Sequence, residues 1–191
     1  MEPRLVALSG TPGTGKSTLA HLASVRLGVH LVDLGVLAKE CGALTSYDGA
    51  RKSWDVDLER LQQAVEGLPR QQGTSLLVGH AAHLLDVPLV VVLRTDPRVL
   101  RERLGQRGWP TSKVDENVEA ETLDTITIEA VEERGIDAVV ELDTSSAGIE
   151  VLLEQLQQVL AGERAKYRPG GIDYSGRLLE SSEGRVAHTR R

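Results

Sequence analysis

The fold is decided by one stretch near the start of the chain, LVALSGTPGTGKS at residues 5–17. Its second part, residues 10–17, fits the pattern G-x-x-x-x-G-K-[ST], in which a glycine-rich loop turns its backbone N–H groups toward phosphates at the start of a helix. An apolar segment, residues 5–8, precedes the loop, and an amphipathic segment, residues 16–27, follows it. This order of strand, loop and helix predicts a phosphate-binding loop for a nucleoside triphosphate.

The residue types in the loop predict how it would hold ATP. Gly13 and Gly15 allow the backbone to curl around an anion, and Lys16 is expected to reach the β- and γ-phosphates. The hydroxyl of Ser17 is expected to ligate Mg²⁺, and Thr18 to contact the α-phosphate. These residues form the predicted ATP site.

Outward from the loop, short apolar runs alternate with amphipathic stretches, which is typical of βαβ units. We expect further strands at residues 29–33, 76–78, 89–93 and 138–142, and helices at residues 34–41, 57–72, 97–106, 113–134 and 148–160, with an interruption of the second helix at Gly67 and Pro69. Residues 42–53 are predicted to be a polar loop. The pattern predicts an α/β fold of the P-loop NTPase type, a doubly wound five-stranded parallel sheet with helices on both faces.

Composition narrows the class further. The chain has 191 residues, of which 40% are hydrophobic and 26% charged, which predicts one compact domain rather than a disordered chain. The single cysteine, Cys41, excludes a disulfide framework and a cysteine-rich zinc site. No apolar run reaches the roughly 18 residues of a membrane span, and the start lacks a signal peptide's pattern, so we expect a cytoplasmic protein.

Charge is distributed unevenly along the chain. The formal net charge is −6, yet residues 164–191 carry seven Lys or Arg against three Asp or Glu. We therefore predict a main domain at residues 1–163 and a basic C-terminal tail at residues 164–191. Two interpretations of the tail stay open, since it could contact nucleic acid or an acidic partner, or only keep the terminus soluble.

The rest of the chain favours a small kinase over a GTPase. A GTPase carries an Asn-Lys-x-Asp motif after a late strand, whereas the nearest match, Ser112-Lys113-Val114-Asp115, lacks the asparagine and follows no strand. A small kinase needs instead a pocket for the phosphate acceptor and a cationic lid that closes over the phosphates. Candidate segments for both parts occur in the chain.

The polar segment that follows residues 29–33 is the candidate acceptor pocket. It contains side chains suited to binding a nucleotide, namely Asp33, Gly35, Tyr47, Arg51 and Asp57. The alternative is an ordinary surface loop with a helix cap.

Arginines crowd the end of the helix predicted at residues 97–106. Arg103 and Arg107 are four residues apart and share a helix face, just before Gly108-Trp109-Pro110. Guanidinium groups next to a glycine suit a lid that closes on phosphates, and the alternative is a solvated basic face.

Several motifs together resemble a known family. They are GTPGTGKST at residues 10–18, VLRTD at 92–96, RLGQRGW at 103–109, Lys113 with ENVEAE at 116–121, and YRPGGIDY at 167–174. In this order they resemble the adenylate kinase isoenzyme six family, most closely its archaeal-type members. The resemblance covers most of the chain.

The resemblance implies a nucleoside monophosphate kinase, converting ATP and AMP to two ADP, with accompanying ATPase activity. It also implies a part in late maturation of the small ribosomal subunit, through transient binding of ribosomal protein uS11. Carried over, residues 33–56 become the monophosphate-binding segment and residues 106–116 the lid, with Arg107 as its nucleotide-contacting arginine.

One position departs from the family. Members commonly place a carboxylate, one residue and then a histidine at the end of the third strand, and here these positions hold Val78 and His80. Mg²⁺ would then depend on Ser17, the phosphates and waters, with Asp33 as a water-mediated ligand, which weakens the case for efficient hydrolysis. Because no carboxylate lies near His80 and His83 in the sequence, we expect His80 to bind water or phosphate rather than a metal ion.

The predicted reaction is in-line transfer of the γ-phosphoryl group, with Lys16, Arg107 and Arg103 stabilising the transferring group. Two other functions stay open. One is a ribosome-assembly ATPase switch that binds uS11 and has incidental kinase activity. The other is a kinase for a small metabolite.

Overall fold

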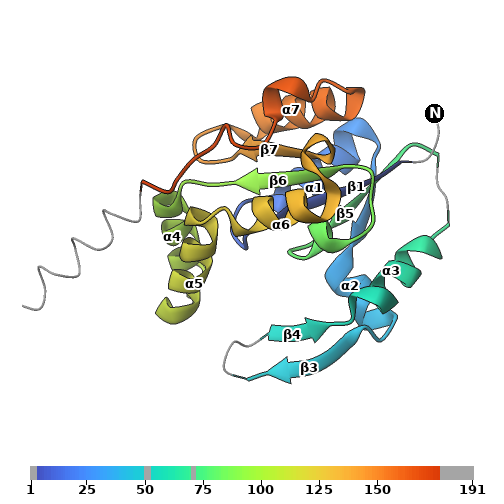
Figure 1. The fold of residues 1–191 in the computed structure, drawn as a ribbon, viewed down its shortest axis with the longest axis horizontal. Helices are drawn as coiled ribbons and strands as arrows, with labels where there is room; N and C mark the ends of the chain where they lie inside the picture. Colours follow the sequence, from blue (N-terminus) through green and yellow to red (C-terminus); the bar gives the residue numbers. More distant parts are fainter. Residues whose placement is uncertain (1–3, 50–52, 70–71, 177–191) are drawn as a thin grey trace, which may run out of the picture.

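Five parallel strands form the centre of the molecule (Figure 1). The computed structural model describes residues 4–49, 53–69 and 72–176. Neighbouring strands of the sheet follow the order β2-β5-β1-β6-β7, and every pair is parallel. The strands are β1 (Arg4–Gly10), β2 (His30–Asp33), β5 (Thr74–Val78), β6 (Val90–Arg94) and β7 (Val139–Asp143). The predicted five-stranded parallel sheet is confirmed.

Helices cover both faces of this sheet, as predicted (Figure 1). They are α1 (Lys16–Leu27), α2 (Leu34–Glu40), α3 (Leu58–Glu66), α4 (Pro97–Gln106), α5 (Thr111–Thr122), α6 (Thr125–Arg134) and α7 (Ile149–Ala161). Short 3-10 turns occur at η1 (Ala82–Leu84), η2 (Ile136–Ala138) and η3 (Ala165–Tyr167). Within the described residues, no helix is long and apolar enough to cross a membrane.

Alternate residues of the central strands face opposite sides of the sheet. In β1, Val6 and Leu8 belong to an apolar cluster with α1 and α7, whereas Ala7 belongs to a second cluster with α2, α3 and α6. All five residues of β6 are buried. A strand covered on both faces reads as a continuous apolar run, which explains why these strands were predictable.

The segment predicted as a polar loop contains a β-hairpin, so that prediction is wrong. Its strands are β3 (Leu44–Asp48) and β4 (Ser53–Val56), which pair antiparallel outside the main sheet. The register shifts between Leu44 and Tyr47, and most of β3 is exposed or half-buried. An exposed, bulged hairpin lacks the alternation of apolar and polar residues that identifies a strand in a sequence.

The single helix predicted at residues 113–134 is two helices, α5 and α6, so that prediction is also wrong. The chain turns at Asp124, the one non-glycine residue with positive φ (56°) in the described structure. Arg94 explains the break, because its guanidinium pairs with the carboxylate of Asp124 and donates to the backbone oxygen of Glu121 (3.0 Å). A distant side chain therefore ends α5, which no local pattern reveals.

The described part of the basic tail packs on the domain. Tyr167 contacts the cluster under α1 and α7, and the Gly170 N–H donates to Glu141 Oε2 (2.9 Å). Tyr174 Oη donates to Asp143 Oδ1 (3.1 Å) at the end of β7. Residues 164–176 thus run along β7, while residues 177–191 lie outside the described residues.

Two valines of α7 provide a matched test of this packing. Val159 is fully buried, whereas Val151 is 47% exposed. We expect Val159→Ala to lower the free energy of unfolding by about 2–3 kcal/mol, since two methyl groups lose burial and leave a cavity. Val151→Ala should change it by less than about 0.5 kcal/mol. Urea unfolding followed by circular dichroism measures both, and equal losses would contradict the placement of α7 on the sheet.

Candidate functional site

The loop between β1 and α1 has the backbone shape of an anion cradle. Gly10, Gly13 and Gly15 have φ angles of 136°, 99° and 97°. A Cβ on Gly10 would lie 2.5 Å from the backbone oxygen of Leu93, and one on Gly13 would lie 2.8 Å from Leu100 Cδ1. Both positions therefore require glycine, because the loop turns while pressed against β6 and α4.

The first turn of α1 presents free N–H groups to a ligand. Gly15 caps the helix without a side-chain hydrogen bond, and the described first turn holds no acidic residue. Thr14 Oγ1 closes the loop by donating to the backbone oxygen of Thr11 (2.9 Å). Ser17 and Thr18 are exposed. Partial positive charge and two hydroxyl groups thus meet at one helix end, as phosphate binding requires.

The ammonium group of Lys16 lies across the loop. Its Nζ donates to the backbone oxygens of Gly10 (2.6 Å) and Thr11 (3.1 Å). Burial lowers the pKa of Lys16 to about 8, with the negative charge of Glu121 raising it and the positive charge of Arg107 lowering it. A partly desolvated cation interacts strongly with any anion that enters the loop.

Asp33 and Val78 lie at the carboxyl ends of β2 and β5, the two strands on one side of β1. Asp33 pairs in register with Val78, which pairs with Leu8 of β1. Asp33 Oδ1 caps α2 by accepting from the Gly35 N–H (2.8 Å), and its other oxygen makes no hydrogen bond within the described residues. Val78 is 7% exposed and packs in the cluster under α1 and α7. This position therefore offers apolar packing and no ligand oxygen.

The donor set fits a magnesium ion that arrives with phosphates. Mg²⁺ prefers oxygen ligands, keeps several waters and binds through one or two carboxylates plus substrate phosphates. The exposed hydroxyl of Ser17 and the second carboxylate oxygen of Asp33 are such oxygens. Across the described ranges, no three His, Cys, Asp or Glu side chains group together as a metal site.

The two histidines that follow β5 have different surroundings. His83 is 1% exposed, with Nδ1 2.9 Å from Ser9 Oγ and Nε2 2.9 Å from Glu129 Oε2. His80 is exposed, and desolvation on its protein side, followed by the charges of Lys16 and His83, lowers its pKa. His83 therefore holds β1 and α6 together, whereas His80 stays accessible beside the loop with a pKa below its usual range.

The arginines predicted for the lid also separate into two kinds. Arg103 is half-buried and donates to the backbone oxygens of Thr144 (2.7 Å) and Gly13 (3.5 Å), so it braces α4 against β7 and the loop. Arg107 is exposed at the end of α4, where its backbone N–H caps the helix, and its side chain makes no hydrogen bond or ion pair within the described ranges. Its charge nevertheless acts on Lys16, so Arg107 is a free cation near the loop.

The residues predicted for the acceptor pocket start separate elements. Asp33 and Gly35 form the start of α2, and Asp57 caps α3 by accepting from the Arg60 N–H (3.0 Å). Arg51 lies outside the described residues. Capping explains why Asp33 and Asp57 stand where they do, whatever else they bind.

Tyr47 projects from the hairpin together with an aromatic residue that the sequence analysis did not select. The rings of Tyr47 and Trp54 lie 5.2 Å apart between centroids, and the residues are 53% and 52% exposed. The hairpin extends below the sheet toward the side where the strands end (Figure 1). It therefore presents a tilted aromatic pair to solvent outside the main sheet.

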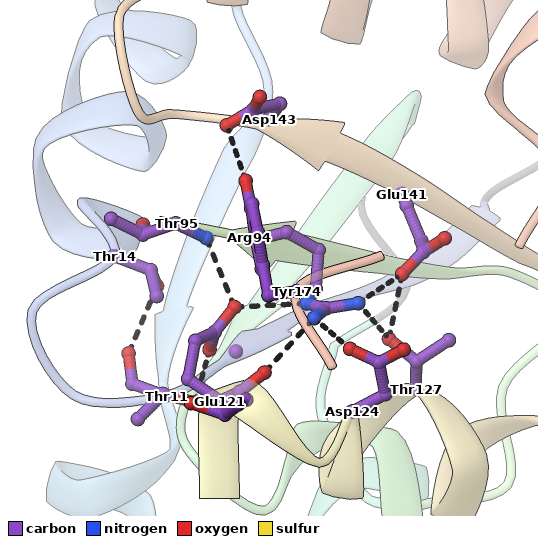
Figure 2. A network of polar contacts seen from close by, with 12 residues as sticks. Thr11, Thr14, Arg94, Thr95, Glu121, Asp124, Thr127, Glu141, Asp143 and Tyr174 are labelled. Carbon is purple, nitrogen blue, oxygen red and sulfur yellow. Dashed lines mark hydrogen bonds and ion pairs between the residues drawn. The ribbon is translucent and has the colours of Figure 1, made fainter. Parts of the chain in front are cut away.

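Behind the loop lies a buried ionic network that the sequence analysis missed (Figure 2). Arg94, 2% exposed, donates from Nε to Glu121 Oε1 (2.8 Å) and from Nη1 to Glu141 Oε1 (2.6 Å), and also pairs with Asp124. Glu121 Oε2 accepts from Thr11 Oγ1 (2.5 Å) in the loop. The network thus joins the loop to α5, α6 and β7.

Part of this network left a signal in the sequence. Arg94 ends the apolar run VVVLR, and Glu141 stands inside the run VVELD. A charge within a buried strand requires an ionic partner, so these two residues could have been paired. Nothing local to Glu121 indicates that it completes the network.

The titration of Lys16 gives a testable pH dependence. The protonated ammonium attracts phosphates, so the affinity of the free protein for Mg·ATP should fall as the pH rises through about 8. Arg107→Ala removes a charge that lowers this pKa, so it should weaken binding and move the fall to higher pH. Titration calorimetry between about pH 7 and 10 measures both effects.

Arg101→Ala is the matched control, because Arg101 lies on the same helix, pairs with Asp115 (2.5 Å) and is not among the charges that shift Lys16. An affinity that does not change with pH would contradict the role of the Lys16 charge.

Sequence comparisons place the chain among known proteins. Residues 6–124 match the AAA domain family. A relative from Pyrococcus abyssi is 39% identical over 171 residues, 90% of this chain and 91% of the relative. Another, from Methanothermobacter thermautotrophicus, is 38% identical over 176 residues, 92% of this chain and 99% of the relative. Both carry the name "Putative adenylate kinase".

Solved structures agree on the fold. Shikimate kinase from Acinetobacter baumannii, in complex with shikimate, superposes with a TM-score of 0.57 at 15% identity, covering 85% of this chain and 95% of that one. At this identity the likeness shows the P-loop kinase fold alone. From these comparisons, the chain belongs to the AAA domain family and to the family of its relatives named "Putative adenylate kinase".

Proposed function

We propose that this chain is an ATP-dependent nucleoside monophosphate kinase, which transfers the γ-phosphoryl group of ATP to AMP and forms two ADP. The observation that carries the proposal is the phosphate loop with Lys16 lying across it and the free cation Arg107 nearby. The name of its relatives supports AMP as the acceptor. Phosphoryl transfer needs positioned reactants and neutralised charge rather than a nucleophilic side chain.

Each group of the site has a part in this proposal. The loop N–H groups from Gly13 to Lys16 hold the phosphates, Thr18 contacts the α-phosphate, and Lys16 binds the β- and γ-phosphates. Arg107 neutralises charge on the transferring group, and Arg103 supports it by fixing α4 on the loop. His80 donates a hydrogen bond to the γ-phosphate or to water.

Magnesium would bind where oxygen ligands meet the loop. Ser17 would ligate the ion, and Asp33 would hold one of its waters. When bound, Mg²⁺ supplies positive charge to the β- and γ-phosphates.

The acceptor is proposed to bind on residues 33–56, with Asp33, Gly35 and Tyr47 in its site. Arg51 and Asp57 complete the proposed set. The exposed pair of Tyr47 and Trp54 supports this placement, because an aromatic face can stack on a base. Residues 106–116 are the proposed lid, within a main domain at 1–163.

We also propose ATP hydrolysis as a slower accompanying activity. Val78 fills the position where a carboxylate would orient water, and it is packed in the apolar core. The exposed His80 is then the group left to hold a water near the γ-phosphate.

Nucleotide chromatography tests the proposal. With Mg·ATP and AMP, we expect two ADP formed for each AMP consumed and little phosphate released. Mg·ATP alone should give slow phosphate release. Phosphate release that AMP does not divert would contradict the kinase and favour an ATPase switch, whereas phosphorylation of a small metabolite in place of AMP would change the acceptor class.

Lys16→Ala should lower the rate of ADP formation by about 100-fold or more, because a cation at the transferring phosphates is lost. Lys166→Ala is the control, since Lys166 is exposed and lies in the segment that packs along β7. Circular dichroism checks that both variants fold. A wild-type, metal-dependent rate in Lys16→Ala would contradict the assignment of this loop as the site of phosphoryl transfer.

A second candidate function is a part in late maturation of the small ribosomal subunit through transient binding of uS11. It is supported by the family resemblance and by the basic end of the chain, where residues 177–191 carry four arginines and two glutamates. Basic segments favour acidic or nucleic-acid partners. In this alternative the protein is an assembly ATPase whose kinase activity is incidental.

The described packing dictates how this candidate should be tested. Removal of residues 164–191 would also remove Tyr167 and Tyr174 from the domain, so the deletion should begin at residue 177. If the end of the chain contacts uS11, this truncated protein should bind uS11 more weakly and still phosphorylate AMP at the wild-type rate. Equal binding of uS11, measured by calorimetry, would refute a contact through these residues.

A further inference from the structure

We propose that Glu121 is a positioning residue, which couples the α4–α5 unit (residues 97–122) to the phosphate loop and, through Thr11, fixes the place where Lys16 meets phosphate. The inference rests on the proposed function only in requiring that the loop bind Mg·ATP. It assigns a function to a residue that lies behind the loop rather than in it.

Glu121 lies in the last turn of α5 with only 3% of its surface exposed. Its carboxylate accepts three hydrogen bonds, from Thr11 Oγ1 (2.5 Å), from Arg94 Nε (2.8 Å) and from the Thr95 N–H (2.9 Å). These donors come from the loop, from the end of β6 and from the residue after it. One side chain therefore fixes the distance between α5, β6 and the loop (Figure 2).

Thr11 connects Glu121 to Lys16 through its hydrogen bonds. Its side chain is held by Glu121, and its backbone oxygen accepts from Lys16 Nζ (3.1 Å) and from Thr14 Oγ1 (2.9 Å). Thr11 is itself 2% exposed. A shift of Glu121 would therefore move the carbonyl on which the ammonium rests.

The α4–α5 unit touches the loop at a second point. Leu100 and Leu104 of α4 pack so closely on Gly13 that a Cβ there would lie 2.8 Å and 3.0 Å from their methyl groups. The same leucines form a small apolar cluster with Val114 of α5, so α4 and α5 are packed together as one unit. The unit thus holds both flanks of the loop, at Gly13 through α4 and at Thr11 through α5, and it carries Arg107 between its helices.

The contact to Thr11 is strengthened by charge, because the same carboxylate also accepts from the guanidinium of Arg94. Arg94 is a permanent cation, and it donates to Glu121 from Nε and to Glu141 from Nη1. A hydrogen bond to a charged acceptor is roughly twice as strong as one between neutral groups. The negative charge of Glu121 also reaches Lys16, so the residue acts on the loop through charge as well as through geometry.

Two threonines of the network allow a matched test. Thr11 donates to Glu121 (2.5 Å) at the loop, and Thr127 donates to Glu141 (2.9 Å) on the far side of Arg94. We expect Thr11→Val to weaken Mg·ATP binding by about tenfold, the value of one charge-assisted hydrogen bond. Thr127→Val should lower the urea midpoint of unfolding about as much as Thr11→Val does, and it should leave the Mg·ATP dissociation constant unchanged. A purely structural network would give the same dissociation constant in both variants.

Further variants test the hydrogen bond itself. Thr11→Ser keeps the hydroxyl and should restore binding to within about twofold of wild type. Glu121→Gln should weaken binding at a fixed pH, because it removes the charged acceptor of the Thr11 hydroxyl.

Titration calorimetry with Mg·ATP and no acceptor gives every binding constant, and urea unfolding gives the stability, so a failure to phosphorylate AMP does not affect the test. The double variant with Thr11→Val and Glu121→Gln should bind about as weakly as the weaker single variant, because both changes break one contact. Additive losses in the double variant, or wild-type binding by Thr11→Val, would overturn the proposal.

Discussion

The ion pairs of the buried Arg94 guanidinium are the interaction on which the structure around the phosphate loop depends. The guanidinium is surrounded by the carboxylates of Glu121, Glu141 and Asp124, which come from three different elements. Burial opposes its charge, but these carboxylates outweigh that cost and raise the pKa of Arg94, so the cation is permanent. Loss of Arg94 would leave the buried carboxylates of Glu121 and Glu141 without their cation, so both residues depend on this one ion. The sheet edge, the end of α5 and the C-terminal segment are held by the same ion.

The ionic network around Arg94 also explains the position of the C-terminal segment. The Arg94 guanidinium lies 5.5 Å from the centre of the Tyr174 ring, and Glu141 accepts from the Gly170 N–H. Burial and neighbouring groups raise the pKa of Tyr174 to about 12, so its hydroxyl remains a donor to Asp143 at any ordinary pH. Residues 164–176 therefore cover the network from outside and keep water away from it.

The sequence predicts the features that neighbouring residues determine, and it does not reveal those that depend on contacts between residues far apart in the chain. The loop at residues 10–17 and the central strands were predictable, because a local motif and continuous apolar runs specify them. The hairpin at β3 and β4 was missed because its sides are exposed, and the break at Asp124 was missed because Arg94, thirty residues away, causes it. Within the site, Lys16 was evident from the motif, whereas the different surroundings of Arg103 and Arg107 depend on tertiary contacts that spacing does not reveal.

The N-terminus of α1 has one more consequence, for the balance between folded and unfolded molecules. No side chain caps this helix, and an anion bound there would satisfy the amides that a serine or aspartate satisfies elsewhere. The bound ligand would then stabilise the folded state, so the free energy of unfolding would rise with the ligand concentration. Molecules in a nucleotide-poor solution would open this end of the sheet more often than molecules in a rich one. The same loop would therefore make the lifetime of the protein respond to the supply of its own ligand.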